Sequence, residues 1–267
     1  MSNMADSKKA FVTTLNTDNY LPGVIVLERS IRENCSHRLF VLVSHGLKES
    51  TYEALRRRGI EFDFADDVDV DPELFAETVD IYSHWKNTLF KLRIFELTQF
   101  EKIVFIDSDI LILEPIDDLF DRPDMSAVIA GRSYPGNEHW RDLNSGVFVI
   151  EPRTDIVNKL IGIVPAVSAV KQSFGDQDIL SEYFSDWPND ERLHLPEGYN
   201  VFLDHYHYYI KHGGVKALHF IGKIKPWMLT GRRMSAVYLR CIIKGNASAV
   251  GVLKRYRRYI SEVDKDE

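Results

Sequence analysis

The residues with the clearest chemical potential are two aspartates that lie one residue apart in an apolar run. The segment KIVFIDSDILILEPIDDLF (102–120) places Asp107-Ser108-Asp109 between two stretches of four apolar residues. A buried carboxylate is costly unless it is paired, hydrogen-bonded or bound to a metal. One interpretation is structural, with Asp107 ending a strand and Asp109 capping a turn. The other is a site for a hard divalent cation, which oxygen ligands at the carboxyl end of a strand suit well.

Three further polar clusters follow where predicted strands end or predicted helices begin. They are Asn144-Ser145-Gly146, Gly175-Asp176-Gln177-Asp178, and a group made of His219, Gly222, Lys223 and Lys225 before Pro226-Trp227. Taken singly, each has an ordinary explanation: a turn, a capped helix start, and a core histidine followed by a solvated loop. Together they supply a cation site, amides and carboxylates for hydroxyl groups, and a backbone-plus-lysine cradle for phosphate.

The chemistry that suits this set is transfer of a sugar from a diphosphate. The departing diphosphate must be neutralised, which Mg²⁺ or Mn²⁺ does as a Lewis acid. A lysine and the N–H groups of a glycine loop add positive potential where charge develops. A histidine beside two carboxylates favours Mn²⁺ over Mg²⁺, because imidazole is the softer ligand.

The elements that must position these clusters alternate between strand and helix. Buried strands are predicted over 10–15 and 38–44, with a crossover helix over 19–35 between them. A helix over 51–59 and a strand over 60–66 continue the pattern of a parallel α/β sheet. The later predictions are an amphipathic helix over 84–100, a strand over 143–153, a helix over 154–170 interrupted at Pro165, a helix over 175–184, and a short strand with its loop over 215–227.

Composition places the chain among globular proteins. Its 267 residues suffice for one large domain or two small ones, and 45% are hydrophobic and 27% charged. Cys35 and Cys241 alone form neither a disulfide framework nor a zinc cluster. The first residues carry no apolar signal segment and no apolar run reaches transmembrane length, so a cytoplasmic location is expected.

The net charge of −7 is unevenly distributed. Residues 205–261 contain 12 Lys and Arg and neither Asp nor Glu. Such a block indicates contact with anions: a phosphate-bearing substrate, an acidic membrane surface or nucleic acid. A membrane- or nucleic-acid-binding module is therefore the alternative to an enzyme. The basic stretch lacks a nucleic-acid-binding motif, and the net charge of the whole chain is negative. Both observations argue against nucleic acid as the partner.

In their order along the chain, five segments resemble glycosyltransferase family 8, which includes glycogenin-like enzymes and bacterial lipooligosaccharide galactosyltransferases. The segments, within residues 9–227, are AFVTTLNTDNY, LFKLRIFELTQFEKIVFIDSDILIL, LNSGVFVIEP, GDQDIL and HFIGKIKPW. The last fits the family signature H-x-x-G-x-x-K-P-W at every fixed position. A sugar-nucleotide pyrophosphorylase, which shares the topology, would instead carry a Gly-rich loop near the N-terminus, and VTTLNTDNYLPG is not one.

The resemblance implies an α/β fold: a single Rossmann-like nucleotide-diphospho-sugar transferase domain of the metal-dependent type over 1–227, with a mixed central sheet flanked by helices. A basic helical extension follows over 228–267. The implied activity is Mn²⁺-dependent retaining transfer of a hexose from a UDP-sugar, with UDP-glucose or UDP-galactose expected and Mg²⁺ as the alternative metal. The acceptor is left open among a glycan, a lipid-linked glycan and a protein.

The resemblance also implies roles for individual residues. The metal ligands are Asp107, Asp109 and His219, and the donor-binding set comprises Thr13, Asn16, Tyr20, Lys91, Asp107, Ser108, Gly222 and Lys225. Within that set, Gly222 and Lys225 match diphosphate-contacting positions. Asn144, Asp176 and Gln177 match residues around the sugar and reaction centre. Gln177 is expected near the attacked face of the sugar, and whether it is a nucleophile or the reaction proceeds by internal return stays open.

Two features of the C-terminal third leave alternatives. Tyr206, Tyr208 and Tyr209 lie in the region that corresponds to a self-glycosylated tyrosine in glycogenin-type members, but packing in the core is the favoured interpretation. The basic segments after Trp227 are predicted to form amphipathic helices. These helices either pack on the catalytic domain or lie peripherally on an anionic membrane.

Overall fold

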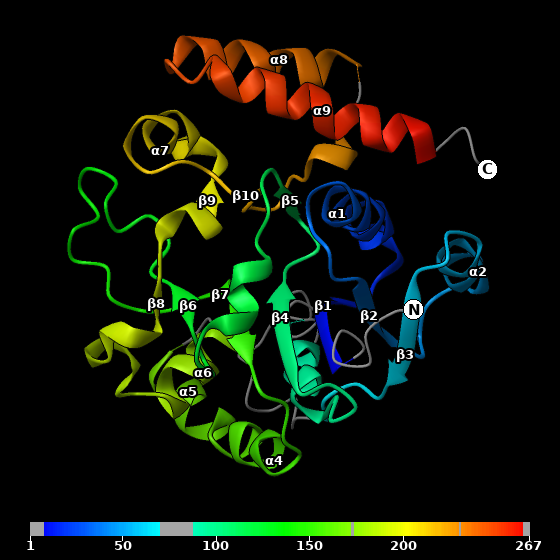
Figure 1. The fold of residues 1–267 in the computed structure, drawn as a ribbon, viewed down its shortest axis with the longest axis vertical. Helices are drawn as coiled ribbons and strands as arrows, with labels where there is room; N and C mark the ends of the chain where they lie inside the picture. Colours follow the sequence, from blue (N-terminus) through cyan, green and yellow to red (C-terminus); the bar gives the residue numbers. More distant parts are fainter. Residues whose placement is uncertain (1–7, 70–87, 172–173, 230, 264–267) are drawn as a thin grey trace.

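The computed structural model describes residues 8–69, 88–171, 174–229 and 231–263. A seven-stranded mixed sheet forms its centre, in the order β3-β2-β1-β4-β7-β6-β8 (Figure 1). These strands are β1 (Lys9–Leu15), β2 (Leu39–Ser44), β3 (Glu61–Ala65), β4 (Lys102–Ile106), β6 (Ala127–Val128), β7 (Asn144–Ile150) and β8 (His194–Leu195). A smaller sheet has the order β5-β10-β9, with β5 (Ile110–Ile112), β9 (Val201–Phe202) and β10 (Ala217–His219).

Helices cover both faces of the large sheet. The α-helices are α1 (Leu21–Asn34), α2 (Glu49–Arg57), α4 (Asp155–Gly162), α5 (Val164–Val170), α6 (Asp176–Tyr183), α7 (Tyr206–His212), α8 (Gly231–Ile243) and α9 (Ser248–Val263). Short 3₁₀ helices are η2 (Asp18–Tyr20), η4 (Phe90–Glu96), η5 (Asp117–Asp121), η6 (Trp187–Asn189), η7 (Glu191–Leu193), η8 (Glu197–Tyr199), η9 (Leu203–His205) and η10 (Pro226–Met228). The predicted α/β fold with a mixed sheet and flanking helices is confirmed.

The strand order creates a crevice at the carboxyl ends of β1 and β4, in the middle of the sheet. β1 pairs in parallel with β2 on one side and with β4 on the other, while β4 pairs antiparallel with β7. The chain therefore leaves β1 in one direction and later returns to its other side. Ligands of open α/β sheets bind at such a switch point, outside the carboxyl ends of the strands.

The central strands are buried on both sides, so their side chains divide between two cores. In β4, Ile103 and Phe105 belong to one hydrophobic cluster and Val104 and Ile106 to another. A third cluster joins α1, the small sheet and α9, where Tyr256 and Tyr259 are almost fully buried. Figure 1 shows α8 and α9 lying across one end of the molecule, over α1 and α7. The predicted C-terminal helices are present, and α9 packs on α1 and against the small sheet.

One predicted helix differs in part from the structure. Of the helix expected over 84–100, residues 84–87 lie outside the described part, Thr88 and Leu89 are α-helical, and Phe90–Glu96 continues as a 3₁₀ helix. Five of its seven residues are buried, Phe90 to Leu92 consecutively, so it has no single apolar face as an amphipathic α-helix would. The strand predicted over 143–153 is present as β7, which begins with Asn144-Ser145-Gly146, so this triplet does not form the turn that was its ordinary explanation.

Candidate active site

A cavity of about 380 Å³ opens at the carboxyl ends of β1 and β4. The side chains around it come from segments far apart in the sequence. They are Thr14, Asn16, Thr17, Tyr20, Thr88, Lys91, Asp107, Ser108, Asp109, Asn144, Ser145, Gly146, Asp176, Gln177 and His219. All four polar clusters identified in the sequence lie at or beside this cavity, as the topology predicts.

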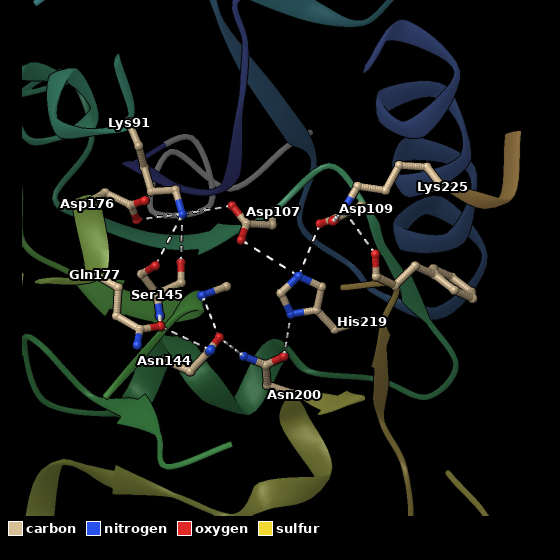
Figure 2. Close-up of polar contacts among 12 residues, drawn as sticks. Lys91, Asp107, Asp109, Asn144, Ser145, Asp176, Gln177, Asn200, His219 and Lys225 are labelled. Carbon is tan, nitrogen blue, oxygen red and sulfur yellow. Dashed lines mark hydrogen bonds and ion pairs between the residues drawn. The ribbon is translucent and has the colours of Figure 1, made fainter. Parts of the chain in front are cut away.

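The backbone around Asp107 and Asp109 is held on two sides. The Asp107 N–H donates to the carbonyl of Gly146 on β7 (2.8 Å), and the Asp109 carbonyl accepts from the Phe220 N–H after β10 (3.0 Å). These bonds bring both carboxylates to His219. The Nε2 atom of His219 lies 3.2 Å from Asp109 Oδ1 and 3.9 Å from Asp107 Oδ2 (Figure 2).

The three side chains fit a divalent cation. Their ligand atoms lie within 4.8 Å of one another, and Asp109 and His219 are buried. Two carboxylate oxygens and one imidazole nitrogen suit Mn²⁺, and Mg²⁺ to a lesser degree. The predicted metal set is thus brought together by the fold.

Glycine at position 146 allows His219 to reach this place. A Cβ atom at Gly146 would lie 2.7 Å from Cε1 and 2.8 Å from Nδ1 of His219. Carbon atoms in ordinary contact are 3.4–4 Å apart, so a side chain here would push the imidazole away. The glycine in Asn-Ser-Gly therefore serves a close approach of β7 to the ring, and not a turn.

Lys91 is a buried cation among acids. Its Nζ lies 2.9 Å from Asp107 Oδ1 and 2.8 Å from Asp176 Oδ2, and it donates to the Ser145 carbonyl at 3.1 Å (Figure 2). Burial alone would lower the pKa of Lys91, but the two carboxylates outweigh it and raise the pKa. Lys91 therefore stays charged and offsets part of the negative charge at the cavity.

The two aspartates of the motif differ in their electrostatic surroundings. Burial raises the pKa of Asp107, and Lys91 opposes this only in part. Burial also acts on Asp109, but His219 and Lys225 outweigh it and hold the pKa of Asp109 well below its usual range. Asp109 is the more firmly ionised of the pair because both His219 and Lys225 lie against it.

Lys225 lies on the loop between β10 and η10. Its Nζ is 2.5 Å from Asp109 Oδ2 and donates to the Phe220 carbonyl at 3.0 Å. The next turn is anchored by Trp227, whose indole N–H donates to the Asn19 carbonyl at 2.8 Å. Lys225 therefore borders the site beside Asp109. Gly222 is exposed on the same loop with φ +96°, and it does not line the cavity.

The opposite side of the cavity carries amides. Asn144 Nδ2 donates to Gln177 Oε1 at 3.1 Å, and the Ser145 N–H donates to the same oxygen at 3.4 Å. Helix α6 presents Asp176 and Gln177 in its first turn. Its start is fixed by the Gly175 N–H, which donates to Asp178 Oδ2 at 2.8 Å.

Most residues predicted from the sequence line the cavity. Asn16, Tyr20, Lys91 and Ser108 line the cavity together with the metal-ligand candidates and the Asn144, Asp176 and Gln177 group. Thr13 does not, because it is fully buried within β1; strand alternation turns its neighbour Thr14 to the cavity instead.

Several residues that the fold places at the cavity had no role assigned to them from the sequence. Thr14, Thr17 and Thr88 line it, and Asn200 hydrogen-bonds to two of its residues, Asn144 and His219. Alternation along β1 could have identified Thr14. No local signal marks Asn200, whose partners lie 19 and 56 residues away.

Tyrosines 206, 208 and 209 pack in the third hydrophobic cluster, around α7. Tyr209 is buried and its hydroxyl donates to Glu197. Among the helices within the described ranges, none is long and apolar enough to cross a membrane.

Comparison with known proteins identifies relatives of this arrangement. The chain is 35% identical over 232 residues to human glycogenin-1, covering 83% of this chain and 63% of that protein. It is 32% identical over 188 residues to inositol phosphorylceramide glucuronosyltransferase 1 of Arabidopsis thaliana, covering 68% of this chain and 31% of the relative. The chain thus spans less than two thirds of the length of these curated relatives.

Solved structures share the fold. The galactosyltransferase LgtC, crystallised with donor and acceptor sugar analogues, superposes with a TM-score of 0.63 at 20% identity, covering 95% of each chain. The glycosyltransferase GlyE of Streptococcus pneumoniae TIGR4, in its apo form, gives 0.58 at 19% identity, covering 96% of this chain and 64% of GlyE. The sequence profile described as "Glycosyl transferase family 8" matches residues 12–231, which is most of the chain. The chain therefore belongs to glycosyl transferase family 8.

Proposed function

We propose that the protein is a retaining glycosyltransferase that moves a hexose from a UDP-sugar to an acceptor with Mn²⁺ as its metal. The observation that carries this proposal is the convergence of the Asp107, Asp109 and His219 cluster with Lys91 and Gln177 on one cavity. UDP-glucose or UDP-galactose is the donor we expect. The acceptor class stays open among a glycan, a lipid-linked glycan and a protein.

The position of each residue in the cavity indicates its proposed role. Asp107, Asp109 and His219 would hold the metal, which neutralises diphosphate oxygens as a Lewis acid when bound. Lys225 borders the same site and is suited to stabilise the charge that develops on the departing diphosphate. On the far side, Asp176 and Gln177 lie at the positive end of α6, where they would orient the hydroxyl groups of the sugar.

The hydrogen bonds of Gln177 favour internal return over an enzyme nucleophile. Its Oε1 accepts from Asn144 Nδ2 and from the Ser145 N–H. An amide oxygen has two lone pairs, and both are engaged by these donors. An oxygen so engaged is a poor nucleophile, so we propose that Gln177 stabilises the sugar cation instead of attacking it.

A donor screen tests the proposal. Purified protein is incubated with single UDP-sugars and candidate acceptors, and UDP release is measured with and without Mn²⁺. We expect Asp109→Asn to lose Mn²⁺-dependent release, while Asp121→Asn, on an exposed carboxylate paired only loosely with Lys9 (3.9 Å), retains it. Both proteins are first stripped of metal, and Mn²⁺ is then added. Equal Mn²⁺-dependent UDP release by the wild type and Asp109→Asn would overturn the assignment. An anomeric configuration inverted in the product would overturn retention.

A second candidate property is peripheral membrane contact, favoured by the surface of α8. Leu239, Ile242 and Ile243 are more than half exposed there, beside the exposed Arg240 and Lys244. By contrast, the apolar face of α9 is used inside the protein, so α9 is not available for such contact. A basic amphipathic helix of this kind can bind anionic lipid.

Sedimentation with anionic vesicles tests this contact. We expect binding that decreases with salt and is lost in the triple variant Leu239→Ser, Ile242→Ser, Ile243→Ser. Val170→Ser, which removes an exposed apolar residue on α5, is the matched control. If the wild type stays in the supernatant at low salt, α8 does not bind anionic membranes. The expected cytoplasmic location, at the inner face of a membrane in this case, stays a prediction.

A further inference from the structure

Asn200 is a fully buried amide that lies behind the metal-ligand candidates. It directly precedes β9, which pairs in parallel with β10 so that Phe202 lies opposite His219. This pairing brings the Asn200 side chain against the imidazole. Its Oδ1 is 2.9 Å from His219 Nδ1, and its Nδ2 donates to Asn144 Oδ1 at 2.6 Å (Figure 2).

A backbone group sets the direction of this hydrogen-bond chain. The Gly146 N–H, which can only donate, bonds to Asn144 Oδ1 at 3.0 Å. Because Asn144 presents its oxygen at that point, Asn200 must offer its NH₂ group there. The oxygen of Asn200 is then the atom that faces His219.

The orientation of Asn200 determines which imidazole nitrogen carries a proton. An amide oxygen accepts hydrogen bonds and cannot donate them, so Nδ1 of His219 must be protonated. Nε2 faces Asp107 and Asp109, whose carboxylates can share a proton with it when no cation is bound, so the proton on Nδ1 is the one that Asn200 determines. Histidines that bind metals commonly donate their other ring N–H to such a partner, which fixes the ring and its tautomer.

The same amide chain reaches the sugar side of the cavity. With its oxygen engaged by Gly146 and Asn200, Asn144 has its NH₂ group free to donate to Gln177 Oε1. We propose that Asn200 is a positioning residue that holds His219 as the Nδ1–H tautomer and, through Asn144, fixes the amide of Gln177. Its effect on the reaction rests on the proposed function, whereas the tautomer does not.

Two variants distinguish the contact of Asn200 with His219 from its contact with Asn144. Asn200→Leu removes both contacts, so we expect the Nδ1–H preference to be lost and Mn²⁺ affinity to decrease 10- to 100-fold. Asn200→Asp keeps an acceptor at His219 but loses the donor to Asn144. We expect it to keep the tautomer and to bind Mn²⁺ within about threefold of wild type, with kcat at least about tenfold lower. Ser126→Ala, at another fully buried polar side chain, is the control.

The tautomer is read directly in the full chain without metal. Long-range ¹H–¹⁵N spectra of ¹⁵N-histidine-labelled protein at alkaline pH show which ring nitrogen is protonated, and His219 is assigned by the signals that His219→Gln loses. Mn²⁺ binding is measured with Mn²⁺ alone by electron paramagnetic resonance, and circular dichroism checks the fold of each variant.

Several results would overturn the inference. They are an unprotonated Nδ1 in the wild type, an unchanged Nδ1 protonation and Mn²⁺ affinity in a folded Asn200→Leu, or an unchanged kcat in Asn200→Asp. Should Asn200→Leu not fold, the wild-type spectrum and Asn200→Asp still decide. Failure of the proposed function looks different: no UDP release by the wild type, with the tautomer and its dependence on residue 200 intact.

Discussion

Replacing Gly146 by alanine is the most direct test of the way in which β7 positions the metal site. The new Cβ would lie 2.7 Å from His219 Cε1, whereas ordinary contacts begin at 3.4 Å. The ring must therefore retreat by about 0.7 Å, the difference between these two distances. It is only 6% exposed and is packed by Phe202, with ring centroids 5.9 Å apart, so it has little free space.

The cost to the fold is bounded. Overpacking a buried site costs about 1–3 kcal/mol. Removing a glycine from the unfolded chain restores about 0.4–1 kcal/mol. The free energy of unfolding should thus decrease by no more than roughly 2.5 kcal/mol, which a domain of ordinary stability survives.

We expect Gly146→Ala to affect metal binding as well as stability. Protein ligands keep their metal distances to about ±0.2 Å, and a 0.7 Å displacement exceeds this tolerance. We expect Gly146→Ala to bind Mn²⁺ at least tenfold more weakly, a change of about 1.4 kcal/mol. The affinity is measured by calorimetry, and stability by urea unfolding.

Gly251→Ala in α9 is the matched control. Its Cβ would meet nothing within 4 Å, so this variant should be about 0.5–1 kcal/mol more stable and bind Mn²⁺ as the wild type does. A folded Gly146→Ala protein with Mn²⁺ affinity within twofold of wild type would refute the argument. It would mean that the imidazole is not held against β7 for the sake of the cation.

Three further outcomes are expected. Gly23→Ala would place a Cβ 2.5 Å from the Ser108 carbonyl, so UDP binding should weaken at least about fivefold in calorimetry even though alanine is the better helix former; unchanged binding would contradict this. Lys225→Met should weaken binding of UDP by about 1.5–3 kcal/mol and leave uridine binding nearly unchanged, and equal losses would show that the lysine is structural. Burial raises the pKa of Asp117, but hydrogen bonds, led by that from His37, outweigh it and lower the pKa. Because the folded-state pKa lies below the unfolded value, the stability it contributes is present at neutral pH and is lost as pH falls below about 4. The difference in unfolding free energy between wild type and Asp117→Asn should therefore close in acid, and a constant difference from pH 7 to pH 3 would speak against it.

The alternation of apolar strands and helices was sufficient to predict the parallel part of the sheet and the strand ends at which the site lies, whereas the mixed character of the sheet was implied by the family resemblance. Asp107 could be placed because an apolar strand ends directly before it. The face of a strand was harder to assign. β1 is buried on both sides, so hydrophobicity does not distinguish the direction of Thr13 from that of Thr14.

Contacts between distant segments account for the rest. Asn200 lies in an unremarkable stretch, and its role depends on the pairing of β9 with β10. Likewise, η4 is enclosed on several sides, which only the assembled structure shows. Sequence periodicity shows which face of one element is apolar. It does not show contacts with several other elements, on which the positions of Asn200 and η4 depend.

The packing of α9 on α1 has a consequence for the order of folding. Tyr259 and Arg255 bond to Glu33, across more than 220 residues of chain. Contacts of such sequence separation form late, because the entropy of closing the loop is lost before they return any energy. Tyr256, on the same helix, stacks on Trp227, which anchors the loop that carries Lys225. We therefore expect the central sheet to form first and the lysine loop to become ordered only when α9 docks. In hydrogen exchange, α9 and this loop should open together, at a lower free energy than the strands.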